Sequence, residues 1–343
     1  MDTEELRRYY KDVFPAEEIV DAFAGPTTEI AYQKDEFFTR HARCETANQL
    51  RQQLVRRVPT KVHVGATYST KKELQGAPIV FDIDLTDYTR RCCQNRKTCC
   101  PVCWPLAACA LDVLGIICEH VVPGSATLDV FSGRRGVHKI VTSAKVHGLS
   151  GPGREAVVEI ANAFSGKDRP VPAVLSVEGN AIVTEAVPPC FRCMEALCKN
   201  GCNGGMGLLD DDGRAVFVDL VLGGRCEIAE LWASLSDARC YCGAGCTSED
   251  AWLRVCKGIP KGHKLYPALV SAVFHFVWPR LDAGVSRQVE HLVKVPYSPN
   301  GTNFAVPIEN AWEFRCDDPP RTDEAIRDTL PILRRFIEQK DRR

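Results

Sequence analysis

Apolar and polar residues alternate along residues 61–68 and 78–85. A period of two is typical of strands that bury one face, so we predict a strand in each segment. Apolar positions recur at helical spacing in residues 4–14, and residues 105–121 also suit a helix. Residues 127–146, "TLDVFSGRRGVHKIVTSAKV", predict a strand, a glycine-rich turn and a second strand.

Turn-rich stretches interrupt this pattern between residues 148 and 213, and they mark boundaries between elements. Strand character returns at residues 291–307, where Asn300 and the glycine after it predict a hairpin turn. Residues 323–343 predict an amphipathic helix that Pro331 breaks or restarts and that ends in basic residues.

This order of elements predicts an α/β (α+β) fold. We expect a mixed-sheet core formed by residues 1–160 and 260–343, split by a mainly helical, cysteine-rich insert subdomain at residues 161–259. No internal repeat is visible in the sequence. A length of 343 residues suits one large domain with insertions or two domains.

Composition is that of an ordinary soluble protein. The residues are 45% hydrophobic and 25% charged, so a packed core is expected. The most apolar windows, residues 104–122 and 265–278, are interrupted by charged residues or are too short, which predicts no membrane span. The charged first residues lack the apolar centre of a signal peptide, which argues against secretion.

Cysteines and charges narrow the possible chemistry. Because secretion is not expected, the 18 cysteines are expected in a reducing compartment, where their short spacings indicate metal binding rather than disulfides. A net charge of −1 excludes a uniformly basic surface that coats nucleic acid. Residues 51–72 carry six basic residues and no acid, whereas residues 82–87 carry three aspartates. Either these runs are solvated faces or one site uses both metal and phosphate.

The strand "VFDIDL" places Asp82 and Asp84 on one side and three apolar residues on the other. Alternate residues on a strand lie roughly 7 Å apart, so these carboxylates can share cations, and without cations they repel each other. Mg²⁺ and Mn²⁺ prefer carboxylate oxygens, and a pair of such ions organises in-line displacement at phosphorus. The alternative is that both aspartates only edge a solvated strand.

The predicted hairpin "SGRRGVH" carries Ser132, Arg134, Arg135 and His138 around two glycines. Glycines permit a tight turn with exposed backbone N–H groups, which suits an anion. The two guanidinium groups, the hydroxyl and the imidazole add the charge and donors that a triphosphate needs. The alternative is a hairpin whose arginines lie in water. The neighbouring aspartate strand favours a nucleotide clamp.

Cys92, Cys93, Cys100 and Cys103 form the pattern C-C-x6-C-x2-C. Four thiolates can hold Zn²⁺ in a closed tetrahedral site, which stabilises a loop and leaves no position open for chemistry. A second group also has ligand-like spacing, namely Cys190, Cys193, Cys198 and Cys202, with Cys240, Cys242 and Cys246 downstream. For this group, burial as small apolar residues is favoured over a second zinc.

Three motifs, "VFDIDLTDY", "RRCC…CPVCW" and "SGRRGVH", occur in this order and resemble the small, catalytic subunit of eukaryotic DNA primase, a member of the archaeo-eukaryotic primase superfamily. Three further segments look like family segments in family order: "LRRYYKDVFP", "KVHVGATYS" and "PRLDAGVSRQVEHLVKVPYS". The resemblance covers the core well and residues 155–260 poorly.

The resemblance implies roles for individual residues. It implies two catalytic Mg²⁺ or Mn²⁺ ions and one structural Zn²⁺. The metal-binding catalytic aspartates would be Asp82, Asp84 and Asp282. The nucleotide contacts would be Arg40, Ser132, Arg134, Arg135, His138, His291 and Lys294. The zinc ligands would be Cys92, Cys93, Cys100 and Cys103, all within a zinc module at residues 92–103.

This sequence departs from the family pattern at two places. His63 replaces an aspartate that lies near the incoming ribose, so the basis of preference for NTPs over dNTPs is open. One inserted residue and the extra thiol of Cys99 leave open whether Cys99 or Cys100 is the third zinc ligand.

The resemblance implies template-directed, de novo synthesis of short RNA primers on single-stranded DNA by two-metal nucleotidyl transfer. It also implies NTP substrates, a primase large subunit as partner, association with DNA polymerase alpha, and a location in the nucleus. Two other functions remain open at this point. One is a superfamily relative that extends primers or repairs DNA, and the other is a non-catalytic, zinc-stapled replication scaffold.

Overall fold

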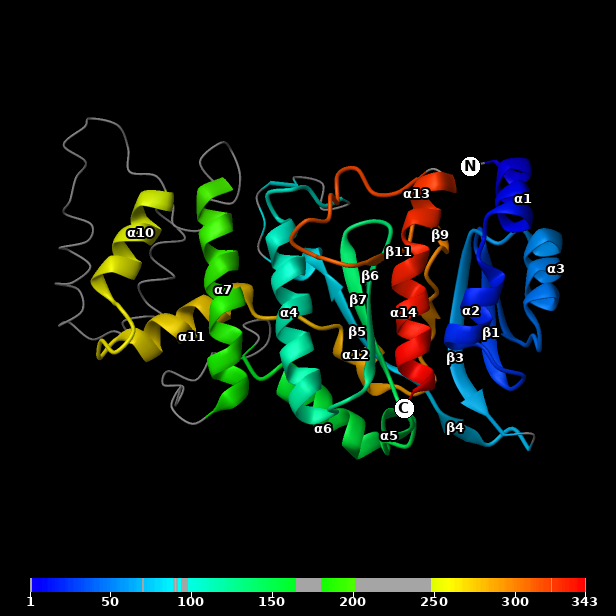
Figure 1. Ribbon diagram of the computed structural model, residues 1–343, viewed down its shortest axis with the longest axis horizontal. Helices are drawn as coiled ribbons and strands as arrows, with labels where there is room; N and C mark the ends of the chain where they lie inside the picture. The colour runs from blue at the N-terminus through cyan, green and yellow to red at the C-terminus, as the bar shows by residue number, and fades with distance from the viewer. Residues whose placement is uncertain are drawn as a thin grey trace. The chain divides into compact units, whose positions relative to one another are not determined.

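A five-stranded and a four-stranded antiparallel sheet organise the first of two units in this chain. The computed structural model (Figure 1) groups Met1–Asp84, Cys118–Ile160 and Leu281–Arg343 into unit 1, and Leu85–Ile117 with Ala161–Arg280 into unit 2. The predicted division into catalytic core and insert stays a prediction. The structure describes residues 2–69, 71–88, 90, 92–93, 98–164, 180–200, 248–321 and 323–342.

The larger sheet of unit 1 has the strand order β2-β1-β3-β4, and β8 also pairs with β3. The strand predicted at residues 61–68 is confirmed as β3. The strands are β1 (Thr28–Lys34), β2 (Phe37–Ala42), β3 (Lys61–Tyr68), β4 (Leu74–Gly76) and β8 (Val293–Lys294).

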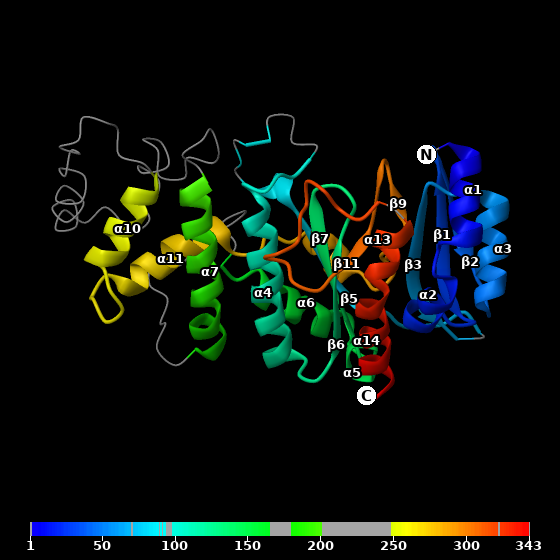
Figure 2. The same cartoon turned by 45° about the horizontal axis from the view of Figure 1, so that its top comes forward.

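Alternation along these strands gives the sheet two different faces. Tyr32 points from one face toward α3, where its hydroxyl donates to Gln53 at 3.0 Å and the Arg57 guanidinium lies over its ring. Figure 2 shows the N-terminal helices beside this sheet. They are α1 (Thr3–Asp12), α2 (Ala16–Phe23) and α3 (Ala47–Arg57). The other face carries His63, which pairs in register with Lys294.

The second sheet of unit 1 has the order β11-β6-β7-β5, and its β6–β7 hairpin confirms the predicted strand, turn and strand. Gly136 opens β7 because a Cβ there would lie 2.4 Å from the Ile83 carbonyl oxygen, which only glycine avoids. The predicted turn after Asn300 joins the short pair β9 and β10. These strands are β5 (Ile79–Asp84), β6 (Ala126–Phe131), β7 (Gly136–Thr142), β9 (Pro299–Asn300), β10 (Asn303–Phe304) and β11 (Val306–Ile308).

The C-terminal segment of unit 1 is helical and is interrupted near the predicted proline. Helix α13 (Asp323–Asp328) ends just before α14 (Leu330–Asp341), and Pro331 lies in the first turn of α14. Proline is tolerated there because the first helical N–H groups have no partner within the helix. The Phe336 ring stacks on Phe23 of α2 with centroids 5.7 Å apart. The other short helices of unit 1 are α5 (Ala144–His147), α6 (Gly151–Ala161) and α12 (Ala283–Arg287).

In unit 2 the described segments are mainly helical. Helix α7 packs against α10 and α11, with the rings of Phe191 and Trp252 5.5 Å apart. Of the second cysteine group, Cys190, Cys193 and Cys198 are buried, whereas Cys202 and the three downstream cysteines lie outside the described residues. The elements are the 3-10 turn η1 (Leu85–Asp87), α4 (Trp104–Val121), which ends in unit 1, α7 (Ala181–Asn200), α10 (Ser248–Gly258) and α11 (Tyr266–Val277).

Helix α4 is long and apolar enough to cross a membrane, by length and composition alone. The charged residues that interrupt it in the sequence therefore do not exclude a span by themselves. Most of the helix is buried inside the protein, however, and the core helix of a soluble protein passes the same test. The α/β class is confirmed. The described strands pair antiparallel throughout, so their sheets are antiparallel and not mixed as predicted.

Candidate active site

Strand β5 carries the two aspartates of the quoted motif on one face. Asp82 and Asp84 are about one-third exposed, at 33% and 35% for their side chains. Phe81 and Ile83 point the other way and are buried. The predicted alternation is therefore present, and it leaves both carboxylates accessible from one side.

A distant segment brings a third carboxylate to the same place. Leu281 forms an isolated antiparallel bridge with Ile83, and the Asp282 N–H donates to the Asp82 carbonyl at 3.1 Å. The Asp282 side chain also caps the start of α12, because its Oδ1 accepts from the Gly284 N–H at 3.1 Å. All three aspartates singled out in the sequence thus meet in unit 1.

The electrostatics of this cluster suit a cation. Burial, followed by the charges of Asp282 and Asp84, raises the pKa of Asp82 to about 6. Such repulsion is relieved when a divalent cation binds between the oxygens. The donor set of carboxylates alone is the one that Mg²⁺ or Mn²⁺ prefers, so these residues fit the predicted ions.

Arg135 is the direct partner of Asp84. Its Nε donates to both carboxylate oxygens, at 2.8 and 3.0 Å, and Nη2 lies 2.8 Å from Oδ2. This bidentate geometry is the strong form of an arginine–carboxylate pair. The sequence assigned Arg135 to a triphosphate, and that role stays a prediction. The structure adds a contact that the motif did not reveal.

The hairpin between β6 and β7 is tightly fixed. Ser132 Oγ accepts from the Gly136 N–H at 3.2 Å. Gly133 has a φ of +87°, and a Cβ there would lie 3.0 Å from the Phe304 backbone, so a larger residue is excluded. The Ser132 carbonyl accepts from Lys294 Nζ at 3.2 Å and from Asn300 Nδ2 at 2.9 Å. Sequence reasoning noted Asn300 only as a turn residue and missed this contact.

A group of basic side chains faces the aspartates. His138 lies opposite Asp82 in register, with Nε2 3.7 Å from Oδ1. Burial and the charges of Lys294 and His291 lower the pKa of His138 to about 3, so its imidazole is neutral at pH 7. Burial and Lys61 lower the pKa of Lys294 to about 8. The charge of Arg134 acts in the same direction on Lys294, which places it near this group.

Arg40 has a buried carboxylate partner that sequence reasoning missed. Glu29 is only 1% exposed, and its two oxygens accept from Arg40 Nε at 2.8 Å and Nη2 at 3.0 Å. Burial alone would raise the pKa of Glu29, but hydrogen bonds from Arg40 and the His41 backbone outweigh it and hold the pKa below its ordinary value. The only sequence signal was a glutamate in an apolar strand segment, "TEIAY".

We expect Glu29→Gln to lower the free energy of unfolding at pH 7 by about 2 kcal/mol, because a buried charged hydrogen-bond partner is lost. The folded pKa lies below the ordinary 4.5, so the carboxylate stabilises the fold above that pH and loses this effect as pH falls through the folded value. Urea unfolding should show a smaller difference in the free energy of unfolding between Glu29→Gln and the parent below pH 4.5 than at pH 7. Glu36→Gln, in the exposed β1–β2 turn, should match the parent at both pH values. A difference independent of pH would contradict this role of Glu29.

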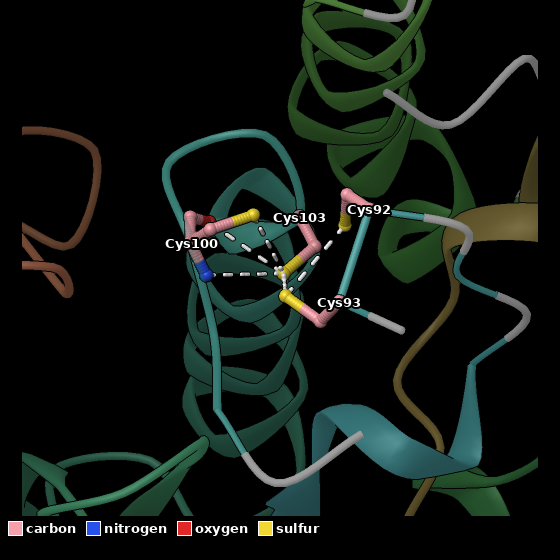
Figure 3. Close-up of side chains that lie close together, drawn as sticks. All are labelled: Cys92, Cys93, Cys100 and Cys103. Atoms are coloured by element: carbon pink, nitrogen blue, oxygen red, sulfur yellow. Dashed lines mark hydrogen bonds between the residues drawn. The ribbon is translucent and has the colours of Figure 1, made fainter. Parts of the chain in front are cut away.

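The cysteine cluster of unit 2 gathers four sulfur atoms (Figure 3), all within 4.8 Å of one another. Cys103 Sγ lies 3.9 Å from the Sγ atoms of Cys93 and Cys100, and Cys92 Sγ lies 3.9 Å from that of Cys93. Four sulfurs around Zn²⁺ at 2.3 Å would be about 3.8 Å apart, so the geometry fits zinc. The cluster includes Cys100, and Cys99 is not part of it.

Two donors support the cluster from outside. The buried Arg90 donates from Nη1 to Cys103 Sγ at 3.4 Å, and the Cys100 N–H donates to the same sulfur at 3.4 Å. The Cys92 thiol, with Arg90 also contributing, lowers the pKa of Cys103 to about 5. Positive charge and N–H donors beside thiolates are the surroundings expected of a zinc–cysteine site. Among the described residues, this is the one group of three or more ligand side chains gathered this closely.

Comparison with known proteins decides the family. Residues 81–309 match the family described as DNA primase small subunit. The chain belongs to this family. The matched segment contains the three aspartates, the hairpin and the cysteine cluster, whereas Arg40 and Glu29 precede it. The resemblance inferred from the three quoted motifs is thereby confirmed.

Relatives with the same description, DNA primase small subunit, match most of this chain. One from Caenorhabditis elegans is 29% identical over 314 residues, which span 80% of this chain and 72% of the relative. One from Drosophila melanogaster is 26% identical over 294 residues, spanning 77% and 64%. One from Schizosaccharomyces pombe is 24% identical over 363 residues, spanning 90% and 73%. At these identities the family is shared, and the roles of single residues must be argued from their contacts.

Proposed function

We propose that this protein is the catalytic subunit of a DNA primase, which synthesises short RNA primers de novo on single-stranded DNA. The observation that carries the proposal is the meeting of Asp82, Asp84 and Asp282 in unit 1, beside a hairpin rich in basic residues. Membership of the primase small subunit family supports it. Primer synthesis joins nucleotides by transfer of a nucleotidyl group, which needs charge neutralisation and alignment more than covalent catalysis.

Each part of the site has a task in this reaction. When bound, Mg²⁺ or Mn²⁺ ions would activate the primer 3′-hydroxyl and neutralise charge on the triphosphate. Asp82, Asp84 and Asp282 would hold these ions. The 3′ oxygen then bonds to the α-phosphorus while the bond to pyrophosphate breaks, and the hydroxyl proton leaves to solvent or a carboxylate.

The basic side chains hold the incoming triphosphate. The Ser132–His138 hairpin supplies its backbone N–H groups and its two arginines. His291 and Lys294 come from the chain segment that contains strand β8. We expect Arg135 to contact the triphosphate while it holds Asp84 in a bidentate pair. Arg40 would contact the nucleotide from strand β2 of the larger sheet while Glu29 holds it in place.

A net charge of −1 implies weak, salt-sensitive binding of single-stranded template by this chain alone. The name of the family implies a large subunit, and we propose that this large subunit contributes to the binding of template and primer. Association with DNA polymerase alpha and a nuclear location belong to the same proposal, as all three relatives above are eukaryotic.

The test is a priming assay on single-stranded DNA with labelled NTPs and Mn²⁺, performed with and without the large subunit. We expect template-dependent products of short length when no primer is supplied. Incorporation only onto a supplied primer would instead identify a primer-extending or repair polymerase. Absence of both nucleotide binding and incorporation would leave the zinc-stapled scaffold as the function.

A further inference from the structure

Strand β2 exposes two adjacent phenylalanines at the edge of the larger sheet. Phe37 is 81% exposed and Phe38 is 47% exposed. Exposed aromatic residues on an edge strand are a liability for aggregation, so an edge that keeps them usually has a binding role. Their cross-strand partners differ, because Phe37 pairs with Lys34 and Phe38 pairs with Gln33 of β1. The two rings therefore lie on opposite faces of the sheet.

Phe38 lies on the face that carries the candidate nucleotide contacts. Gln33, its partner on β1, pairs in turn with Lys61 on β3. Arg40, two residues further along β2, contacts Glu29 on the same face of β1. The side chains of Phe38, Arg40 and Lys61 thus share one face of unit 1.

Phe38 reaches across β1 to His63 on β3. The centroids of the two rings are 5.6 Å apart and their planes are inclined by 54°. Ala31 of β1 pairs with His63 in register and is fully buried. Its single methyl group leaves room for the two rings to meet above it. We call this pair, Phe38 and His63, the ring shelf.

The ring shelf continues directly into the candidate triphosphate site. His63 pairs with Lys294 across β3 and β8, and Lys294 Nζ contacts the Ser132 carbonyl of the hairpin. Neighbouring strands are about 4.8 Å apart, so the shelf is displaced from Lys294 by about two strand spacings. That displacement is comparable to the span between the phosphates and the base of a nucleotide.

The chemistry of the ring shelf suits a base of any identity. Burial and the charge of Lys294 lower the pKa of His63 to about 3, so both rings are neutral at pH 7. Stacking on such rings depends little on which base is present, since every base has a π-face. An enzyme that copies a template must accept four bases at one site, and hydrogen bonds to base edges would restrict it.

We propose that the ring shelf of Phe38 and His63 supports the base of the incoming nucleoside triphosphate. This inference rests on the proposed function, because it assumes that a triphosphate lies between the hairpin and Lys294. The charges around the shelf, from Arg40 and Lys61, are complementary to a nucleotide. Phe38 is the exposed member and is the contact that a substitution removes with least effect on the fold.

The experiment compares two ligands of the full chain by equilibrium binding in Mn²⁺. ATP carries a base, and inorganic tripolyphosphate does not. Phe38→Ala should weaken the binding of ATP about tenfold, in line with the loss of one stacked ring. It should leave the affinity for tripolyphosphate unchanged. Phe38→Tyr should restore ATP binding. Phe37→Ala, which removes a more exposed ring from the other face, should match the parent for both ligands.

Three results would overturn the inference. They are an unchanged affinity of Phe38→Ala for ATP, an equal loss for ATP and tripolyphosphate, and a loss confined to a single-stranded oligonucleotide, which would assign Phe38 to the template. The binding assay needs no turnover. If Phe38 supports ATP binding but no primer is made, the proposed function fails alone. If primers are made and Phe38→Ala binds ATP normally, this inference fails alone.

Discussion

Replacing Asp82 with asparagine is expected to reduce primer synthesis by about a thousandfold or more, with the fold retained. Asparagine keeps the shape of the side chain and removes the charge that a cation needs. The same change removes a carboxylate whose pKa is raised to about 6 by burial and then by the charges of Asp282 and Asp84. Without metal, Asp82→Asn should therefore be at least as stable as the parent.

Thermal unfolding in EDTA and in Mn²⁺ separates loss of metal binding from loss of structure. The parent should gain stability from Mn²⁺, because a ligand that binds only the folded state raises its apparent stability. Asp82→Asn should gain little. Asp35→Asn, in the exposed β1–β2 turn where φ is +52°, is a matched control, since asparagine tolerates that conformation. Primer synthesis by Asp82→Asn near the parent rate would remove the aspartate cluster from the mechanism.

Replacing Cys100 with serine is expected to release zinc and to lower the first thermal transition by about 10 °C, because a structural zinc contributes directly to folding. The parent should contain one zinc per chain by elemental analysis. The matched control is Cys99→Ser, which removes the neighbouring buried thiol that the cluster does not include. That variant should keep its zinc.

The opposite pattern, with zinc lost from Cys99→Ser and kept by Cys100→Ser, would reverse the ligand assignment. Two zinc ions per chain would show that the second cysteine group also binds metal. The structure places Cys190 Sγ 3.8 Å from Cys109 Sγ in a fully buried setting, which suits packed thiols. Four of the seven cysteines in that group lie outside the described residues, so metal analysis is the decisive measurement for them.

The sequence predicted those features whose cause is local. Alternation of apolar residues placed Asp82 and Asp84 on one face of a strand, and two glycines with polar neighbours predicted the hairpin that begins at Ser132. The spacing of the four cysteines predicted their cluster, because C-x2-C brings two thiols together within one turn of chain.

Features that depend on contacts between distant parts of the chain could not be predicted from a local sequence pattern. Asp282 was assigned through the family resemblance, since nothing near it in sequence distinguishes it from other acids. Lys294 and His291 were likewise assigned through the resemblance, and Lys294 lies on strand β8, within the segment predicted to have strand character. The ion pairs of Arg135 with Asp84 and of Arg40 with Glu29 join separate strands, and no local pattern encodes which acid meets which arginine.

The backbone contact between Asp82 and Asp282 also determines the stage of folding at which the aspartate cluster is complete. The two residues are 200 positions apart, and they are joined through the Asp282 N–H and the bridge of Leu281 to Ile83. Closing a loop of that length has an entropy cost that only the assembled sheets of unit 1 offset. A growing chain on the ribosome therefore carries Asp82 and Asp84 long before the third carboxylate emerges. If the proposed function is correct, metal-dependent activity would begin only after the C-terminal part of unit 1 has folded back onto β5.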